Sequence, residues 1–257
     1  MIIRKSPAEI EQMAEAGRVV AEVLALVAEH MQPGVQTAEL DAVADDHIRS
    51  RGGIPTFKGY RGYPASICVS PNSMVVHGIP GGYVLADGDV VSIDVGVTLG
   101  GFVADSAWTF PVGEISREAE RLLQACEDAL EAGIDQARAG NRVGDVSAAV
   151  QRSAEDAGFA VIKSLVGHGV GRSMHEEPQV PNFGQPGRGP RLATGTTIAI
   201  EPMISAGSDA VFVHEDGWSI STEDASLAAH FEHTVAVTDD GPRVLTPPAG
   251  VGAPLLP

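Results

Sequence analysis

Two aspartates lie in what reads as one β-hairpin, and their placement predicts a bound cation. Asp94 and Asp105 lie in runs of β-branched and apolar residues on either side of a glycine pair. A turn at Leu99-Gly100 would place them opposite each other, whereas a turn at Gly100-Gly101 would shift the pairing by two residues and keep both on one face. A three-residue loop would separate them unless a bulge intervened. Like charges at this spacing repel, so partly buried carboxylates must share a proton or bind a metal ion.

The second half of the chain supplies three further groups that could complete such a site. His168 lies between two glycines, and Glu201 and Glu232 lie in strand-like runs. Together with the aspartates they form a hard, oxygen-rich set suited to a pair of Co²⁺, Mn²⁺, Fe²⁺ or Zn²⁺ ions. Such a pair activates water near neutral pH, so the set predicts metal-assisted hydrolysis. His77 and His175 are weaker candidates, because a single histidine is often a hydrogen-bonded core or surface residue.

Length and composition indicate an ordinary globular protein. The chain has 257 residues and is 44% hydrophobic, enough for one large domain or two small ones. Its formal charge of −17 argues against a DNA-binding surface. Two isolated cysteines form no disulfide framework, which favours a reducing cytoplasm. No signal-peptide core is present, and no apolar run approaches the roughly 20 residues that span a bilayer, so we expect no membrane association.

The periodicity of the chain predicts two helices followed by strands, twice over. In the first half, a helix begins with the cap Ser6 and stops at Pro33-Gly34, and Thr37 caps a second helix through about Arg51. In the second half, Ser116 caps a helix that ends near Gly140. A fourth helix is expected at 144–157. The predicted strands are 66–70, 73–77, 89–97 and 102–110 in the first half, and 159–166, 195–202, 210–214, 217–221 and 229–238 in the second.

This repeated order predicts an internally duplicated α+β architecture whose sheets meet along one seam. We expect residues 1–257 to form a single catalytic domain with halves at about 6–112 and 113–246. The Gly/Pro-rich stretch 182–195 is predicted to be a surface loop, and 247–257 a loosely held tail.

Seven short motifs closely resemble those of the type I methionine aminopeptidases, in the family's order and spacing. They are VVHGIP at 75–80, SIDVG at 92–96, ADS at 104–106, GHGVG at 167–171, MHEEPQV at 174–180, AIEPM at 199–203 and FEHT at 231–234. The resemblance runs from about residue 6 to 246. It implies the pita-bread fold, a pseudo-symmetric α+β domain with a curved antiparallel sheet covered by helices.

The resemblance also implies roles for the candidate ligands. By it, Asp94, Asp105, His168, Glu201 and Glu232 bind two divalent metal ions, with Asp105 and Glu232 bridging them. Glu201 would also help to move the proton of the attacking water.

Further residues match the family's catalytic and substrate-binding positions. His175 would polarise the scissile carbonyl, and His77 would contact the substrate backbone near the scissile bond. Positions that match the family's pocket for the methionine side chain are Tyr60, Tyr63, Cys68, Met174 and Trp218. Arg61, Met174 and the pair Val103-Ala104 depart from the usual pattern, which bears on the shape of the pocket.

The implied activity is removal of the initiator methionine from nascent polypeptides when the second residue is small. The resemblance further implies a cytoplasmic monomer, with transient contact to the ribosome where its substrates emerge. The absence of the type II helical insertion and of an N-terminal extension favours a short bacterial-style form. Three alternatives are a Xaa-Pro aminopeptidase on the same fold, a non-catalytic pita-bread binding protein, and a dinuclear phosphoesterase, which the acidic composition disfavours.

Overall fold

The computed structural model describes residues 2–247, with two helices and five strands in the first half. The helices are α1 (Pro7–His30) and α2 (Thr37–Ser50), and a 3₁₀ turn covers Tyr60–Gly62. The strands are β1 (Ile54–Pro55), β2 (Cys68–Pro71), β3 (Met74–Val76), β4 (Val90–Leu99) and β5 (Phe102–Pro111).

The second half repeats this order with more strands. Its helices are α3 (Arg117–Gln136) and α4 (Val143–Asp156). Its strands are β6 (Ala160–Val161), β7 (Val166–Gly169), β8 (Glu176–Pro181), β9 (Thr197–Ile200), β10 (Met203–Ser205), β11 (Val211–Val213), β12 (Ile220–Thr222), β13 (Ala228–His230), β14 (His233–Thr238) and β15 (Gly241–Val244).

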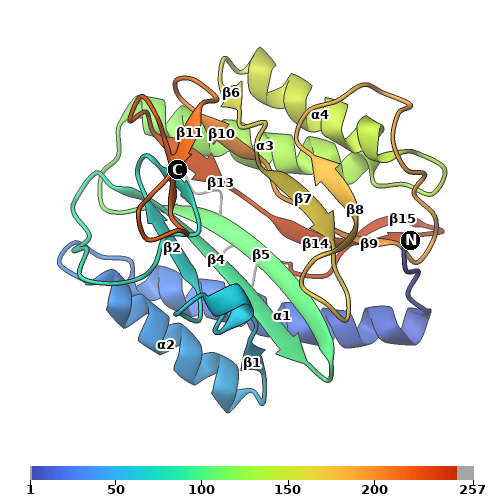
Figure 1. The fold of residues 1–257 in the computed structure, drawn as a ribbon, viewed down its shortest axis with the longest axis horizontal. Helices are drawn as coiled ribbons and strands as arrows, with labels where there is room; N and C mark the ends of the chain where they lie inside the picture. Colours follow the sequence, from blue (N-terminus) through green and yellow to red (C-terminus); the bar gives the residue numbers. More distant parts are fainter. Residues whose placement is uncertain (1, 248–257) are drawn as a thin grey trace.

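The strands form four antiparallel sheets, of which two position the candidate ligands. In the first half, β4 pairs with β1, β2 and β5, and in the second half the order is β15-β14-β9-β7-β8. Two small sheets, β13-β10-β6 and β11-β12-β3, accompany them. Helices α1 and α2 lie on one side of the strands and α3 and α4 on the opposite side (Figure 1). The predicted α+β architecture of two helices and a group of strands, repeated, is therefore confirmed.

Helix α1 shows how the sequence specifies this packing. The Ser6 amide donates to Glu9 Oε2 (2.9 Å), the Glu9 amide donates to Ser6 Oγ (3.4 Å), and Pro7 occupies the first helical position. The apolar side of helix α1 packs on β4 and β5, with Met13 and Val20 fully buried. The core that results is continuous across both halves of the chain and includes residues from all four helices.

The β4–β5 hairpin takes the second of the predicted registers. Leu99 pairs with Phe102 across a Gly100-Gly101 turn, in which both glycines have positive φ (59° and 80°). A two-residue turn of this kind matches the twist of a hairpin and requires residues that tolerate φ > 0. Asp105 consequently faces Gly96 rather than Asp94, and the two carboxylates lie diagonally on one face.

The two halves are joined at β5 through hydrogen bonds that also bring together two of the candidate ligands. The Glu232 amide donates to Ala107 O (2.8 Å), and Ser106 Oγ donates to Glu232 O (2.5 Å). The Asp105 amide donates to Thr234 Oγ1 (3.0 Å), and that hydroxyl donates back to Asp105 O (2.8 Å). These bonds are buried, so they fix the backbone on which the Asp105 and Glu232 carboxylates stand.

Two predicted helix boundaries are wrong. Thr37 is the first residue of α2 rather than its cap, because its hydroxyl forms hydrogen bonds with the backbone of Gly81. At this helix start the Glu39 carboxylate accepts a hydrogen bond from the amide of Gln36. Helix α3 ends at Gln136 and not near Gly140. There the side-chain amide of Asn141 donates to the terminal Gln136 carbonyl (2.9 Å), which satisfies the helix end early.

The strand predictions differ from the structure in a systematic way. The predicted strands 159–166 and 229–238 are each two strands that belong to different sheets, because the chain crosses from one sheet to another within each run. Strands β1, β8, β10 and β15 were not predicted. Of these, β1, β8 and β15 contain proline and lie at the edges of their sheets, where proline is tolerated and propensity is a poor guide. Strand β10 lies between β13 and β6, directly after Pro202.

The predicted loop at 182–195 contains no helix or extended strand, as expected. Of the predicted tail at 247–257, all but Pro247 lies outside the described residues. None of the helices within residues 2–247 is both long and apolar enough to cross a bilayer.

Candidate metal centre and its pocket

The structure brings all twelve residues named from the sequence to the wall of one cavity of about 200 Å³. The five candidate ligands come from both halves: Asp94 from β4, Asp105 from β5, His168 from β7, Glu201 from the end of β9, and Glu232 from the link between β13 and β14. The other seven are His77, His175, Tyr60, Tyr63, Cys68, Met174 and Trp218.

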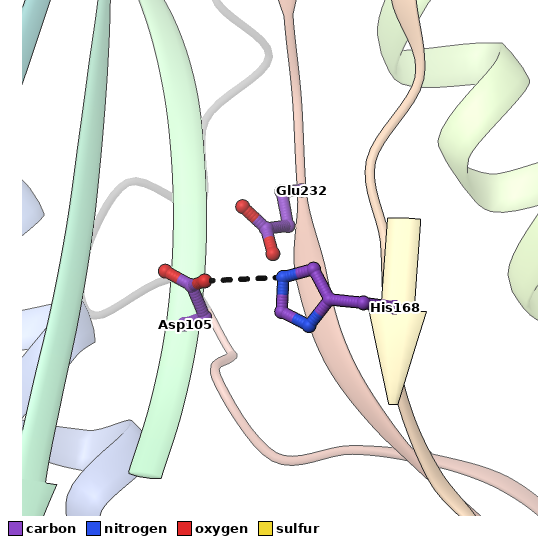
Figure 2. Close-up of side chains that lie close together, drawn as sticks. All are labelled: Asp105, His168 and Glu232. Atoms are coloured by element: carbon purple, nitrogen blue, oxygen red, sulfur yellow. Dashed lines mark ion pairs between the residues drawn. The ribbon is translucent and has the colours of Figure 1, made fainter. Parts of the chain in front are cut away.

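The four candidate acids form a carboxylate cluster, which consists of Asp94, Asp105, Glu201 and Glu232. The Nε2 atom of His168 points into this cluster. This atom lies 3.7 Å from Asp105 Oδ2 (Figure 2). It also lies 3.6 Å from Glu201 Oε1. Those separations exceed a hydrogen bond, but two atoms that each lie about 2.1 Å from one ion can be up to about 4.2 Å apart. His168 Nδ1 is 2.9 Å from the Gly169 carbonyl, which can only accept, so the ring proton lies on Nδ1 and Nε2 keeps its lone pair.

The carboxylates are short of partners that would stabilise negative charge. Asp94 Oδ1, Asp105 Oδ1 and Glu232 Oε1 are buried without a hydrogen-bond partner in the described part of the chain. No lysine or arginine within residues 2–247 forms an ion pair with any of the four acids. Burial raises the pKa of Asp94 to about 7, and burial together with the neighbouring carboxylates raises the pKa of Asp105 and Glu201 well above the usual range. The donor set fits hard divalent ions, which would restore the ionised forms.

We expect the metal-free protein to lose thermal stability as the pH rises from 7 to 8.5. The folded-state pKa values of Asp105, Glu201 and Glu232 are raised well above normal, whereas these groups ionise near pH 4 in an unfolded chain. A raised pKa stabilises the folded state fully only below the unfolded-state pKa, and this contribution is lost as the pH rises to the folded-state value. The buried histidines have lowered pKa values and are essentially neutral in both states above pH 7, so they do not reverse this slope.

Scanning calorimetry of chelator-treated protein measures this effect directly. The midpoint Tm should fall between pH 7 and 8.5, and added Mn²⁺ should raise Tm more at pH 8.5 than at pH 7. Glu232→Gln, which removes one of the raised groups, should flatten the metal-free profile. A metal-free Tm that is constant over this range would show that the acids are already ionised and stabilised by other means.

His230 is a residue of this centre that the sequence reasoning missed. Its Nε2 lies 3.7 Å from Glu201 Oε2 and 3.8 Å from Glu232 Oε2, and these three residues form a second group able to hold a metal ion. The signal was present in the sequence, since His230 and Glu232 are two residues apart in an extended run. Such spacing places two side chains on one side of the backbone.

His175 lies between the carboxylate cluster and Tyr60. Its Nδ1 is 2.8 Å from the Tyr60 hydroxyl, and its ring centre lies 4.2 Å from that of His168. Burial, with a smaller contribution from the charge of Arg61, lowers the pKa of His175, so the ring is neutral near pH 7. When the phenol donates to Nδ1, the ring proton lies on Nε2, which is then a donor for a substrate oxygen.

His77 is held in an unusual backbone conformation at the end of β3. Its φ of +60° lies in the left-handed region, which costs free energy for a residue with a side chain and is frequent at functional sites. The next residue must be glycine, because a Cβ at Gly78 would come within 2.1 Å of the Val69 carbonyl oxygen. The His77 ring packs edge-to-face on Trp218 at 6.4 Å. Burial lowers the pKa of His77 to about 4, so it is neutral at pH 7.

The rest of the cavity wall is apolar, aromatic and sulfur-containing. Tyr63 is fixed by hydrogen bonds from its hydroxyl to the carbonyls of Ile67 (3.1 Å) and Gly78 (2.8 Å), and its ring meets Trp218 edge-to-face at 5.1 Å. Burial raises the pKa of the Cys68 thiol, so that side chain is neutral. Lining residues that the sequence reasoning did not assign to the pocket are Phe57, Val76, Leu165, Val166 and Met203.

Comparisons with known proteins agree with the fold and with this site. The model of metallopeptidase family M24 matches residues 11–239. The methionine aminopeptidase of Clostridium perfringens is 50% identical over 246 residues, which cover 96% of this chain and 99% of that protein. The crystal structure of a methionine aminopeptidase from Thermotoga maritima superimposes with a TM-score of 0.94 at 44% identity, and covers 96% of this chain and 99% of that one.

The fold and the cavity thus define a metallopeptidase, and the chain belongs to family M24 and, within it, to the type I methionine aminopeptidases. The resemblance seen in the seven motifs and the pita-bread fold that it implied are confirmed. A prolidase from Pyrococcus horikoshii shares the fold at a TM-score of 0.76 and 20% identity, with this chain covering only 64% of its length.

Proposed function

We propose that this protein is a cytoplasmic metallo-aminopeptidase that removes the initiator methionine from nascent polypeptides whose second residue is small. The observation that carries the proposal is the convergence of four carboxylates and His168 on the wall of one cavity whose other lining residues are largely apolar and aromatic. Because the acids come from both halves of the chain, the two halves act as a single catalytic domain.

Two divalent ions, Co²⁺, Mn²⁺, Fe²⁺ or Zn²⁺, would be held by Asp94, Asp105, His168, Glu201 and Glu232, with Asp105 and Glu232 bridging. Bound there, the ions would polarise the scissile carbonyl and lower the pKa of the attacking water. Glu201 is the least buried of the acids that surround His168, with a side chain 13% exposed, so it can both reach the ions and accept the proton of that water.

Two neutral histidines, His175 and His77, bind the substrate near the scissile bond. His175, with Nδ1 held by Tyr60, presents Nε2 to the carbonyl oxygen and stabilises the negative charge that develops there. His77, fixed by its strained backbone and by Trp218, contacts the substrate backbone near the scissile bond.

The cavity accounts for specificity at the first residue. A volume of about 200 Å³ suits one large side chain, and the surfaces of Tyr63, Cys68, Met174 and Trp218 suit a thioether. We expect the site beyond the scissile bond, near the carboxylates, to be narrow, so that a bulky second residue would clash there.

We further propose that the protein works as a monomer in transient contact with the ribosome, where the N-termini of nascent polypeptides emerge. The formal charge of −17 requires that any such contact use a local basic patch. A Xaa-Pro aminopeptidase and a non-catalytic binding protein are the alternatives, and both can be separated from this proposal by one assay.

The test is release of free amino acid from three peptides by protein that has been depleted of metal and then reconstituted with each candidate ion. Met-Ala-Ser should be cleaved, whereas Met-Leu-Ser should be slower by at least about 10-fold and Ala-Pro should not be cleaved. Cleavage of Ala-Pro alone would identify a Xaa-Pro peptidase. No release from any peptide with any ion would favour the binding protein.

A further inference from the structure

We propose that His230 is a further metal ligand of this centre, whose Nε2 binds one of the two ions together with Glu201 and Glu232. This inference rests on the proposed metallo-aminopeptidase function and adds a second imidazole to its ligand set. Each ion of the pair would then have one histidine, His168 at one ion and His230 at the other.

The geometry of His230 repeats that of His168. Each Nε2 atom lies 3.6–3.8 Å from one oxygen of Glu201 and from an oxygen of a second carboxylate, Asp105 or Glu232. The two histidines approach different oxygens of Glu201, Oε1 for His168 and Oε2 for His230, so this carboxylate lies between the two rings. Distances of this size are too long for hydrogen bonds and fit pairs of ligands around one ion.

Both ring nitrogens of His230 lack a hydrogen-bond partner in the described part of the chain. The residue is 1% exposed. A buried imidazole without partners is costly, because its polar atoms lose their hydration and gain nothing in return. A divalent ion at Nε2 would supply the missing interaction.

The ring is also held in place by its backbone. The His230 amide donates to Thr109 Oγ1 (2.9 Å), and the same hydroxyl donates to the His230 carbonyl (2.8 Å). On the other side His230 pairs with Met203 in the β10–β13 ladder. A ligand on such a fixed backbone is preorganised for binding.

A neighbouring histidine differs in the partners of its ring and provides a matched control. His233 is also buried, but its Nδ1 is 3.0 Å from Thr246 Oγ1 and 3.4 Å from Ser106 Oγ, and its ring packs against Trp108. It belongs to no group able to hold a metal ion within the described chain. Its role is structural.

The experiment is proton NMR of the full-length protein loaded with Co²⁺. A histidine that binds paramagnetic Co²⁺ through Nε2 gives a strongly shifted N–H signal from Nδ1, which disappears on exchange into D₂O. The wild-type protein should give two such signals, His230→Gln one, and His233→Gln two. Calorimetric titration with Co²⁺ should show the Kd of one ion increased by about 10-fold or more in His230→Gln and unchanged in His233→Gln.

One shifted imidazole signal in the wild type, or two signals together with unchanged Kd values in His230→Gln, would overturn the inference. The wild-type count decides the matter even if His230→Gln does not fold. A wild type that binds two ions, releases methionine and shows one signal would leave the proposed function intact and remove only His230 from the ligands. A wild type that binds no ion would overturn both.

Discussion

Asp105→Asn is expected to abolish tight metal uptake and to lower kcat/KM for Met-Ala-Ser by at least about 10³-fold, equivalent to about 4 kcal/mol of transition-state stabilisation. The substitution keeps the size of the side chain but removes the charge that is proposed to bridge both ions. The amide also brings an N–H₂ donor into a pocket whose neighbours, Glu232 and Asp94, are themselves anionic when metal is bound.

Metal content by mass spectrometry and turnover by methionine release test this variant together. Asp128→Asn is the matched control: it makes the same change at an exposed position on α3 and should keep metal and activity. The metal-free Asp105→Asn protein should be at least as stable as the metal-free wild type at pH 8, because it has one buried acid fewer. An Asp105→Asn protein with full metal content and turnover would remove Asp105 from the centre.

His175→Ala is expected to keep both metal ions and to lower kcat by about 10²- to 10³-fold, with a smaller change in KM. Its side chain lies beside the carboxylate cluster, but Nδ1 is occupied by Tyr60 and the ring belongs to neither group able to hold a metal ion. The loss should therefore fall on the transition state, where the carbonyl oxygen gains charge, rather than on metal binding.

The measurement is steady-state kinetics with metal content determined on the same samples. His30→Ala, at an exposed position near the end of α1, serves as the control and should behave as the wild type. Loss of metal from His175→Ala in proportion to its loss of activity would instead make His175 a ligand.

The sequence predicted the β4–β5 hairpin and its cation site best, because the strand periodicity and the chemistry of Asp94 and Asp105 point to the same place in the chain. The sequence left three possible connections for the β4–β5 hairpin, and the observed Gly100-Gly101 turn is one of them, because both glycines can take the positive φ values that a tight turn needs. The cation could be predicted because two buried carboxylates on one face of a hairpin repel each other unless they share a proton or bind a metal ion. The gathering of all twelve predicted residues around one cavity was implied by the resemblance in motifs, since single residues far apart in the chain give no distance information.

What could not be predicted depends on tertiary context. Strands β8 and β15 form only because β7 and β14 offer edges to pair with, and their own residues do not favour extended structure. His230 was overlooked because a lone histidine is usually structural, and His233 shows that this is sometimes correct. The carboxylates of Glu201 and Glu232 beside His230, and the hydroxyl partners of His233, distinguish the two in the folded chain.

Anomalous diffraction from crystals of the protein prepared with Mn²⁺ will show whether two divalent ions lie among these acids. Two anomalous peaks are predicted, both within bonding distance of Asp105 and Glu232, with Asp94 at one ion and His168 at the other. A metal-replete crystal without anomalous density at these carboxylates, from protein that still releases methionine, would show that the acids do not hold the catalytic ions.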